Sequence, residues 1–210
     1  MIFAKLKTLA LALILIFVAA CDESVTNSGD NEIMPLDFNN EWFGSLVTYS
    51  FDGTIIDSAD FNYRIFDSII INGAKWFGLE YIFDNTDTTD SKILLQAGSG
   101  GLWSRRNCAP STCPAYFYAK YPAIKNDTFY TADTVYSFAR VVSVDTAITV
   151  PAGTFTCNAY IWYINNFFED YKIYYLAPNI GYVKIETYGI DPVDAPYVEQ
   201  VWYLEHYRVK

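Results

Sequence analysis

The residues that most often do catalytic chemistry are scarce in this chain. The sequence has one histidine, His206, in a stretch that reads as a strand, and a single histidine cannot build the usual zinc site. There is no Gly-x-Ser-x-Gly nucleophile elbow, no P-loop and no dinucleotide fingerprint. The glycines of 98–101 (GSGG) join two expected strands and open no helix, so they do not predict a phosphate site. We therefore expect no cofactor, and we predict a protein that is not an enzyme.

Carboxylates are the one abundant set of reactive groups, with 24 Asp and Glu. A glycosidase-like envelope hydrolase would need two of them on either side of the scissile bond, but no pair stands out, so this function is kept as the alternative. Three acids in 84–90 (DNTDTTD) are spaced three apart, and Ca²⁺ prefers oxygen ligands. The residue order of a calcium loop is missing, so we interpret this stretch as a solvated hairpin tip and predict no metal site.

Three cysteines follow residue 21. Cys108 and Cys113 lie five positions apart in NCAPSTCP, where two prolines indicate a turn that can bring them together. A zinc site would need a second pair of ligands nearby, so we predict a loop-closing disulfide between Cys108 and Cys113. Cys157 alternates with apolar residues, which indicates a buried free thiol rather than a nucleophile.

Aromatic residues give the only other indication of a binding function. They make up 18% of the chain, and tyrosine and tryptophan offer rigid faces that can stack on a sugar or cover an acyl chain. The alternative is that these side chains fill the interior of a curved sheet. As candidate ligand-binding residues we name the five tryptophans: Trp42, Trp76, Trp103, Trp162 and Trp202.

The N-terminus has the pattern of an export signal. Lys5 and Lys7 precede an apolar run from Leu9 to Ala20, which is shorter than the roughly 20 residues of a membrane span and ends in small residues. The sequence Val-Ala-Ala-Cys that ends at Cys21 resembles the lipobox of bacterial lipoproteins. That resemblance implies cleavage after residue 20 and acylation of Cys21, which would anchor the protein to a membrane by lipid. An ordinary secretory signal with a cysteine after its cleavage site is the other interpretation.

The same resemblance bears on location. Asp22 follows Cys21, and in enteric bacteria an aspartate there resembles a signal for retention at the inner membrane. In the Bacteroidota an acidic stretch after the cysteine resembles a surface-export signal instead. We expect a bacterial cell-envelope protein anchored in the outer membrane, on its periplasmic or surface face.

Composition limits the partners and the number of domains. Without residues 1–20 the chain carries 12 basic and 24 acidic residues, a net charge of 12 − 24 = −12, and nucleic acids or anionic lipid headgroups call for a basic face instead. Residues 21–34 are polar and without pattern after the cysteine, so we predict a flexible tether. The remaining residues, 35–210, suit a single domain.

The domain is predicted to be all-β. No stretch has a helical period, and runs rich in Tyr, Phe, Val, Ile and Thr alternate with turn signals. Asn72-Gly73 is the strongest of these, because a type I′ hairpin turn needs positive φ at both positions. We expect strands at 41–50, 60–71, 74–83, 92–97, 102–106, 128–132, 135–149, 154–164, 170–176, 181–188 and 197–209. Short connections favour an antiparallel meander of 10–11 strands, curled into an open or partly closed barrel.

Two local patterns can be tested in detail. In the hairpin around Pro151, pairing positions that sum to 303 sets Ile148 opposite Phe155, Val144 opposite Ala159 and Val142 opposite Ile161, all on one face. Separately, 34–43 (MPLDFNNEWF) and 121–130 (YPAIKNDTFY) share a proline, an Asn-Asn or Asn-Asp pair and two aromatic residues at equal offsets. This is either a duplicated strand-entry element or a coincidence in an aromatic-rich chain.

Two motifs carry a resemblance to a family. The stretch 150–155 (VPAGTF) at a strand entry and 177–184 (APNIGYVK), with Pro35-Leu36 and Trp42 near the start, are similar to motifs of uncharacterised bacterial cell-envelope lipoproteins. The resemblance implies a β meander or half-barrel and says little about activity. The predicted lipid tether, the excess of aromatic residues and the lack of a catalytic set lead us to expect a lipid-anchored binding module for a hydrophobic or glycan ligand, or for an envelope protein.

Overall fold

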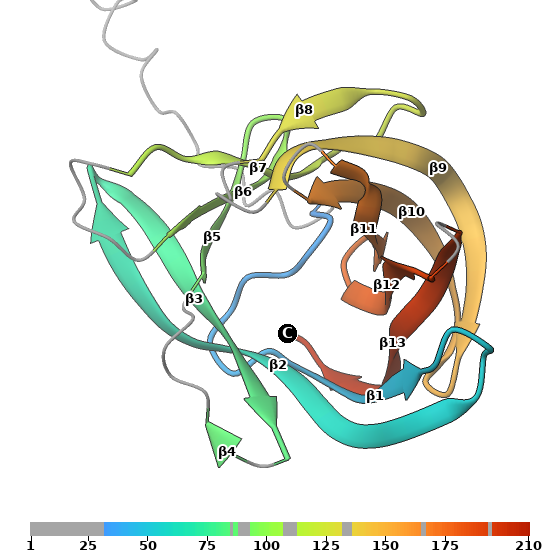
Figure 1. Cartoon of the computed structure of the whole chain (residues 1–210). Coiled ribbons are helices and arrows are strands. Elements are labelled where there is room, and N and C mark those ends of the chain that lie inside the picture. Colours follow the sequence, from blue (N-terminus) through green and yellow to red (C-terminus); the bar gives the residue numbers. More distant parts are fainter. Residues whose placement is uncertain are drawn as a thin grey trace, which may run out of the picture.

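The fold is a single curled sheet. The structure, a computed structural model, describes residues 32–84, 86–87, 93–106, 113–131, 136–164, 167–192 and 195–210. All regular structure in these ranges is β, and they contain no helix long and apolar enough to cross a bilayer. The thirteen strands form one antiparallel sheet that bends round into a nearly closed barrel (Figure 1). The predicted fold class is confirmed.

The strands follow one another with short connections. Their bounds are β1 (Glu41–Tyr49), β2 (Ile55–Ile71), β3 (Ala74–Phe83), β4 (Thr86–Asp87), β5 (Ile93–Gly98), β6 (Gly101–Arg106), β7 (Tyr116–Lys120), β8 (Thr128–Tyr130), β9 (Tyr136–Val150), β10 (Gly153–Ile164), β11 (Phe167–Ala177), β12 (Gly181–Ile190) and β13 (Pro196–Arg208). Asn72 and Gly73, between β2 and β3, have φ values of 53° and 81°. Both φ values are positive, as the predicted type I′ turn requires.

The strand order closes the barrel at one junction and leaves it open at another. The order is β7-β6-β5-β3-β2-β1-β13-β12-β11-β10-β9-β8, with β4 paired to β3 outside this path. The first and last strands of the path, β7 and β8, are neighbours in the sequence, and Lys120 Nζ at the end of β7 donates to Asp127 Oδ2 just before β8 at 2.9 Å. We call this junction the seam. At the other junction β1 pairs along β13 from Glu41↔Arg208 to Thr48↔Gln200.

Aromatic side chains fill the barrel. Tyr63 stacks on Tyr182 with ring centroids 4.6 Å apart, and Trp202 meets Tyr63 edge-on at 5.3 Å. The hydroxyls of Tyr118, on β7, and Tyr182, on β12, are hydrogen-bonded to each other across the interior. The core therefore joins strands that are far apart in the sheet order.

The beginning of the described chain also belongs to this core. Ile33 and Met34 are buried inside the barrel, and the backbone N–H of Asn179 donates to Glu32 O at 2.7 Å. Packed structure thus begins before residue 35, where the domain boundary was predicted. The predicted signal peptide, and the predicted tether up to residue 31, lie outside the described residues.

The two similar sequence segments form the same turn around their asparagines, although the bond before the shared proline is cis only in the second, at Tyr121-Pro122. Asn39 and Asn126, which are 126 − 39 = 87 positions apart, both adopt left-handed backbone conformations, with φ values of 66° and 70°. Asn39 N donates to Ile65 O at 2.9 Å, and Asn126 N donates to Val141 O at 2.8 Å. We call each of these segments an entry turn, because β1 or β8 begins directly after it.

Two further hydrogen bonds are repeated at the entry turns. Ile65 N donates back to Asn40 O, and Val141 N donates back to Asp127 O, both at 2.9 Å. Within each turn the residue after the left-handed asparagine donates to a carbonyl three positions earlier, at 3.1 Å in the first turn and 3.0 Å in the second. The resemblance between the two segments is therefore a repeated strand-entry element and not a coincidence.

The hairpin around Pro151 confirms part of the predicted register. Ile148 pairs with Phe155, and Thr149 pairs with Thr154. Further along, Ala159 pairs with Ser143 and Ile161 with Arg140, so the partners predicted there, Val144 and Val142, are wrong. Two bulges on β9 add residues to that strand, one of them at Asp145 with φ of 52°, and each bulge shifts the register beyond it.

Candidate functional site

Most of the predicted ligand-binding tryptophans lie in the interior. Trp42, Trp162 and Trp202 belong to the barrel core, where the Nε1 atoms of Trp42 and Trp202 donate to backbone carbonyls of Ile180 and Phe61. Trp76 is buried in a second, smaller cluster with Ile71 and Leu94. Trp103 is half-buried, with its ring 3.9 Å from that of Phe117. For three of the five, the interior alternative describes where the structure places the ring, whereas Trp76 is buried outside the barrel core.

The predicted cysteine sites are only partly within the described ranges. Cys21 and Cys108 lie outside them, and Cys113 is disulfide-bonded, so the predicted Cys108–Cys113 pairing stays a prediction. Cys157 is free and fully buried, as expected, and burial raises the pKa of its thiol to about 12.

The other candidate sites give no metal centre in the described part of the chain. His206 stacks on Phe43 with ring centroids 4.2 Å apart. Most of 84–90 lies outside the described residues. Among the residues that are described, no group of three or more His, Cys, Asp or Glu is arranged to hold a metal ion.

A groove on the outer face of the barrel is a better candidate. Along β12 and β13 the side chains alternate between the two faces of the sheet. Ile185 and its partner Trp202 point into the core, so Glu186 and its partner Val201 lie on the opposite face. The groove on that face has a volume of about 340 Å³ and lies between the β1–β2 turn and β12–β13. It is lined by Tyr49, Ser50, Phe51, Gly53, Lys184, Glu186, Tyr197, Val198, Val201 and Tyr203.

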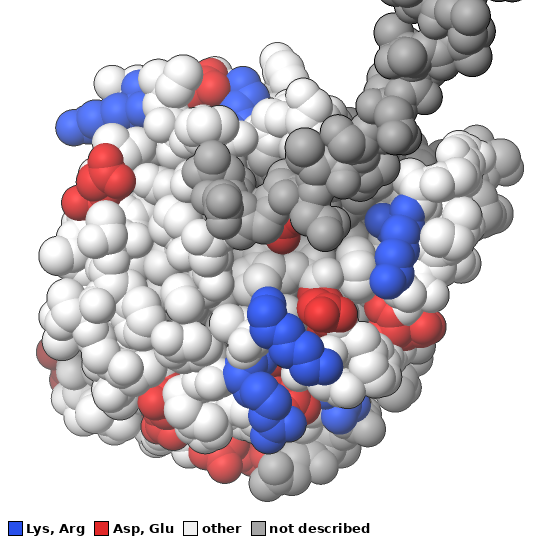
Figure 2. Space-filling view, turned by 180° about the vertical axis from the view of Figure 1, so that it is seen from behind, with Lys and Arg blue, Asp and Glu red and all other residues white. Residues whose placement is uncertain are grey.

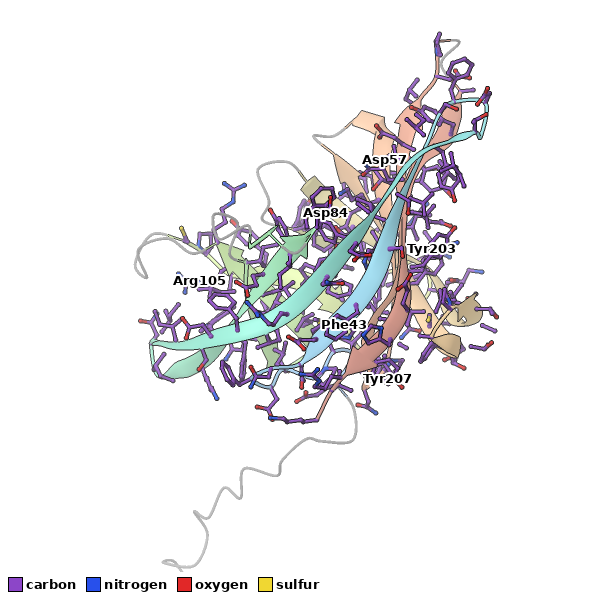
Figure 3. The ribbon with its side chains drawn as sticks, turned by 90° about the horizontal axis from the view of Figure 1, so that it is seen from below. Phe43, Asp57, Asp84, Arg105, Tyr203 and Tyr207 are labelled. Atoms are coloured by element: carbon purple, nitrogen blue, oxygen red, sulfur yellow. The ribbon has the colours of Figure 1, made fainter. Side chains whose placement is uncertain are left out.

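The position of the groove can be followed on β13. Tyr203 pairs with Lys184 on one side and with Ser45 of β1 on the other. In Figure 3, Tyr203 lies beside β1, whereas Phe43 and Tyr207 lie toward the other end of the same strands. The groove therefore crosses β12, β13 and β1 near the end of β1 that leads into the β1–β2 turn.

A hydrogen-bonded carboxylate forms the floor of this groove. Glu186 is 8% exposed, and its Oε1 lies 2.6 Å from Lys184 Nζ. Its Oε2 accepts hydrogen bonds from the hydroxyls of Tyr175 at 3.0 Å and Tyr188 at 3.2 Å. Both carboxylate oxygens thus have partners, as a buried charge requires, and the contacts fix the positions of two tyrosine rings.

Cationic and phenolic groups surround this carboxylate. Lys184 Nζ lies 5.5 Å from the ring centre of Tyr203 and 5.7 Å from that of Tyr175, within the range of cation–π attraction. Burial, followed by the charge of Glu186, raises the pKa of Tyr188 to about 12. Burial and a hydrogen bond with Tyr49 raise the pKa of Tyr203 to about 12 as well. These hydroxyls are therefore neutral at physiological pH and can donate or accept hydrogen bonds.

A row of aromatic residues leads away from the groove. Five of them are successive register partners across five neighbouring strands: Tyr130, Phe138, Tyr163, Tyr171 and Tyr188. We call this row the aromatic ladder. Phe138 stacks on Tyr163 at 4.7 Å, and Tyr171 stacks on Tyr188 at 4.5 Å. At a strand spacing of about 4.8 Å, the ladder extends roughly 19 Å across the sheet.

The arrangement favours binding over acid–base chemistry. Of the described residues that line the groove, Glu186 alone is an acid, whereas a glycosidase needs two carboxylates about 5–9.5 Å apart. On the face shown in Figure 2, acidic and basic side chains are interspersed over a largely uncharged surface. The groove itself is lined by four aromatic residues, with Lys184 and Glu186 as its charged residues, and it suits a ligand with many hydroxyl groups and apolar faces better than a highly charged one.

The sequence did not indicate this site. Lys184 and Glu186 are two positions apart in a strand, which places them on one face, and that signal could have been noticed. The ladder and the Tyr203–Lys184 contact depend on the register between strands, which bulges shift at several places. Their partners therefore could not be read from the sequence.

Comparison with known proteins identifies the fold. A Bacteroides fragilis protein described as exported and as having a YmcC-like fold superimposes with a TM-score of 0.51 at 16% sequence identity, covering 85% of this chain and 99% of that chain. A Parabacteroides distasonis protein described as a lipoprotein gives a TM-score of 0.49 at 15% identity, with the same coverage. No family model and no curated protein matches the sequence. The chain is thus similar in fold to the Bacteroides fragilis protein.

Proposed function

We propose that this protein is a lipid-anchored cell-envelope protein that binds a saccharide in the Glu186 groove. The observation that carries the proposal is the combination of aromatic rings with a buried, fully hydrogen-bonded carboxylate. A sugar presents apolar C–H faces and hydroxyl groups, which match the ring faces and the polar tips of tyrosines. The ion pair of Glu186 with Lys184, another lining residue, holds the charged floor of the groove in place before a ligand arrives, which lowers the entropy cost of binding.

The anchoring part of the proposal rests on the N-terminal sequence. A basic start, a short apolar run and Val-Ala-Ala-Cys favour export followed by acylation of Cys21. The fold similarity to a protein described as exported agrees with an envelope location. The outer membrane is the membrane that we propose.

The binding site can be tested by one substitution and a matched control. Tyr203→Ala removes a ring that lines the groove and should weaken binding at least tenfold to any glycan selected from an oligosaccharide panel. Phe38→Ala removes an aromatic side chain that is 53% exposed and precedes the opposite end of β1, about 27 Å from Tyr49 along the strand. Calorimetric titration with the selected glycan should show a weakened affinity for Tyr203→Ala and an unchanged affinity for Phe38→Ala. Equal affinities in the wild type and Tyr203→Ala would reject the groove as the site.

The anchor can be tested separately. Cys21→Ser removes the predicted acylation site and should move the protein from the membrane fraction to the soluble fraction of lysed cells. Retention of the variant in the membrane fraction would contradict lipid anchoring and would leave the binding proposal standing.

A further inference from the structure

The Glu186 groove continues onto an exposed apolar hairpin tip. Phe51 lines the groove and is 62% exposed. Ile55 is the register partner of Tyr49, another lining residue, and is 62% exposed as well. Ile56, the next residue, is 66% exposed. Together these three side chains, which we call the apolar tip, form an uncharged extension of a polar and aromatic groove.

The hairpin that carries the apolar tip is held by its own hydrogen bonds. Asp52 accepts hydrogen bonds from the Ser50 hydroxyl and from Thr54 N, the latter at 2.9 Å, and these contacts lower the pKa of its carboxyl group. Gly53 N donates to Ser50 O at 2.9 Å, and Ser50 N donates to Thr54 O at 2.8 Å. The polar residues of the turn therefore fix its shape, while the apolar residues beside them are presented to solvent.

Large apolar side chains grouped on a fixed hairpin commonly mark a binding surface. We propose that the ligand of the Glu186 groove is a saccharide joined to an apolar chain, with the sugar in the groove and the chain against the apolar tip. This inference rests on the proposed function, since it names the ligand class of the same groove. We infer a single amphipathic molecule because the groove and the apolar tip are continuous. Phe51 belongs to both, and Tyr49 of the groove pairs with Ile55 of the tip.

The test uses glycosides that differ only in their alkyl chain. Methyl, hexyl and octyl β-D-glucoside are titrated below their micelle concentrations into the full chain carrying Cys21→Ser. Affinity should rise with chain length and reach about tenfold between the methyl and octyl compounds, because each buried methylene group contributes to binding. In the double variant Ile55→Ser/Ile56→Ser, which leaves the residues that line the groove unchanged, that increase should disappear, while the affinity for the methyl compound stays the same.

The outcomes separate this inference from the binding proposal. Equal affinities for the three glucosides, or an increase that survives in the double variant, would overturn the role of the apolar tip and leave sugar binding in place. Binding of the octyl compound that is unaffected by Tyr203→Ala would contradict the groove itself. If none of the three glucosides binds, the result counts against both the proposed sugar site and the role of the apolar tip.

A membrane surface is the competing occupant of the apolar tip. If the tip inserted into lipid, the protein would bind phosphatidylcholine vesicles that contain no glycolipid, and Ile55→Ser/Ile56→Ser would abolish that binding. This result in a vesicle flotation assay would overturn the inference. We expect no flotation of the Cys21→Ser chain with such vesicles, before or after the double substitution.

Discussion

The two junctions of the barrel begin with the same turn and end differently. At the β13–β1 junction, the entry turn at Asn39 leads into a strand of nine residues that pairs with β13 over almost its whole length. At the seam, the entry turn at Asn126 leads into β8, which has three residues and lies at one end of the strand order. The same local structure thus produces a closed wall at one place and a free edge at the other.

The two junctions differ in the length of the strand that follows each entry turn. Beyond its paired region β1 continues to Tyr49 and the β1–β2 turn, which form one side of the groove. β8 stops after Tyr130, and the seam is bridged by the Lys120 side chain to Asp127 and to Thr128 O. The groove is thus found at the junction where the strand after the entry turn is long.

Loss of a large ring at the closed junction should have the largest effect. Trp202 is buried on β13 beside β1, and Trp202→Ala should lower the free energy of unfolding by about 3–5 kcal/mol. Phe117, near the seam on β7, is only partly buried, so Phe117→Ala should cost about half as much. Urea unfolding monitored by far-UV circular dichroism gives both values. Equal losses would show that the two junctions are equally well packed.

The entry turns should respond alike to substitution. Asn39→Ala and Asn126→Ala each place a Cβ-bearing residue without a polar side chain in a left-handed conformation, which costs about 1–2 kcal/mol. Asn39→Gly and Asn126→Gly are the controls, and they should retain most of the stability because glycine adopts this conformation readily. Chemical unfolding of the four variants gives the values. A large loss at one turn and none at the other would contradict their equivalence.

The Lys120–Asp127 ion pair should affect local opening of the barrel at the seam more than it affects the stability of the whole domain. Lys120→Met removes the ion pair with Asp127. The side chains of Lys120 and Asp127 are 28% and 35% exposed, and surface pairs of this kind contribute at most about 1 kcal/mol to the free energy of unfolding. Amide hydrogen exchange in 116–120 and 128–130 should become faster, while β1 and β13 are unaffected. Faster exchange throughout the barrel would show that the seam does not open on its own.

Tyr188 and Tyr203 should begin to lose their contribution to stability only under alkaline conditions. The pKa values of Tyr188 and Tyr203 are raised to about 12, above the value near 10 of an exposed tyrosine. The folded state holds these protons more tightly than the unfolded state, so their contribution to stability is complete below pH 10 and is lost as the pH rises toward 12. Tyr203→Phe should reduce the loss, which can be followed by tyrosinate absorbance and chemical unfolding at each pH. A loss of stability between pH 7 and 9 would not fit this assignment.

The sequence allowed the strands and turns to be predicted better than the site. Asn72-Gly73 and Pro151 indicated their hairpins because turn conformations limit the residues that fit. β7 was missed because it has five residues and stands between Pro114 and Pro122, which read as loop signals. The tryptophans were candidates for binding because of their type alone, and burial depends on tertiary packing. The ladder and the groove depend on pairings between strands that the bulges of β9, β12 and β13 displace.

The buried start of the described chain has a mechanical consequence. Any pull that reaches the domain from the N-terminal side acts first on Glu32, whose carbonyl is held by Asn179, and then on Ile33 and Met34 inside the barrel. Such a load is shared between the barrel core and the β11–β12 turn, and it does not peel an edge strand from the sheet. The start of the described chain is therefore suited to bearing tension, which the lipid anchor that we propose would place on it.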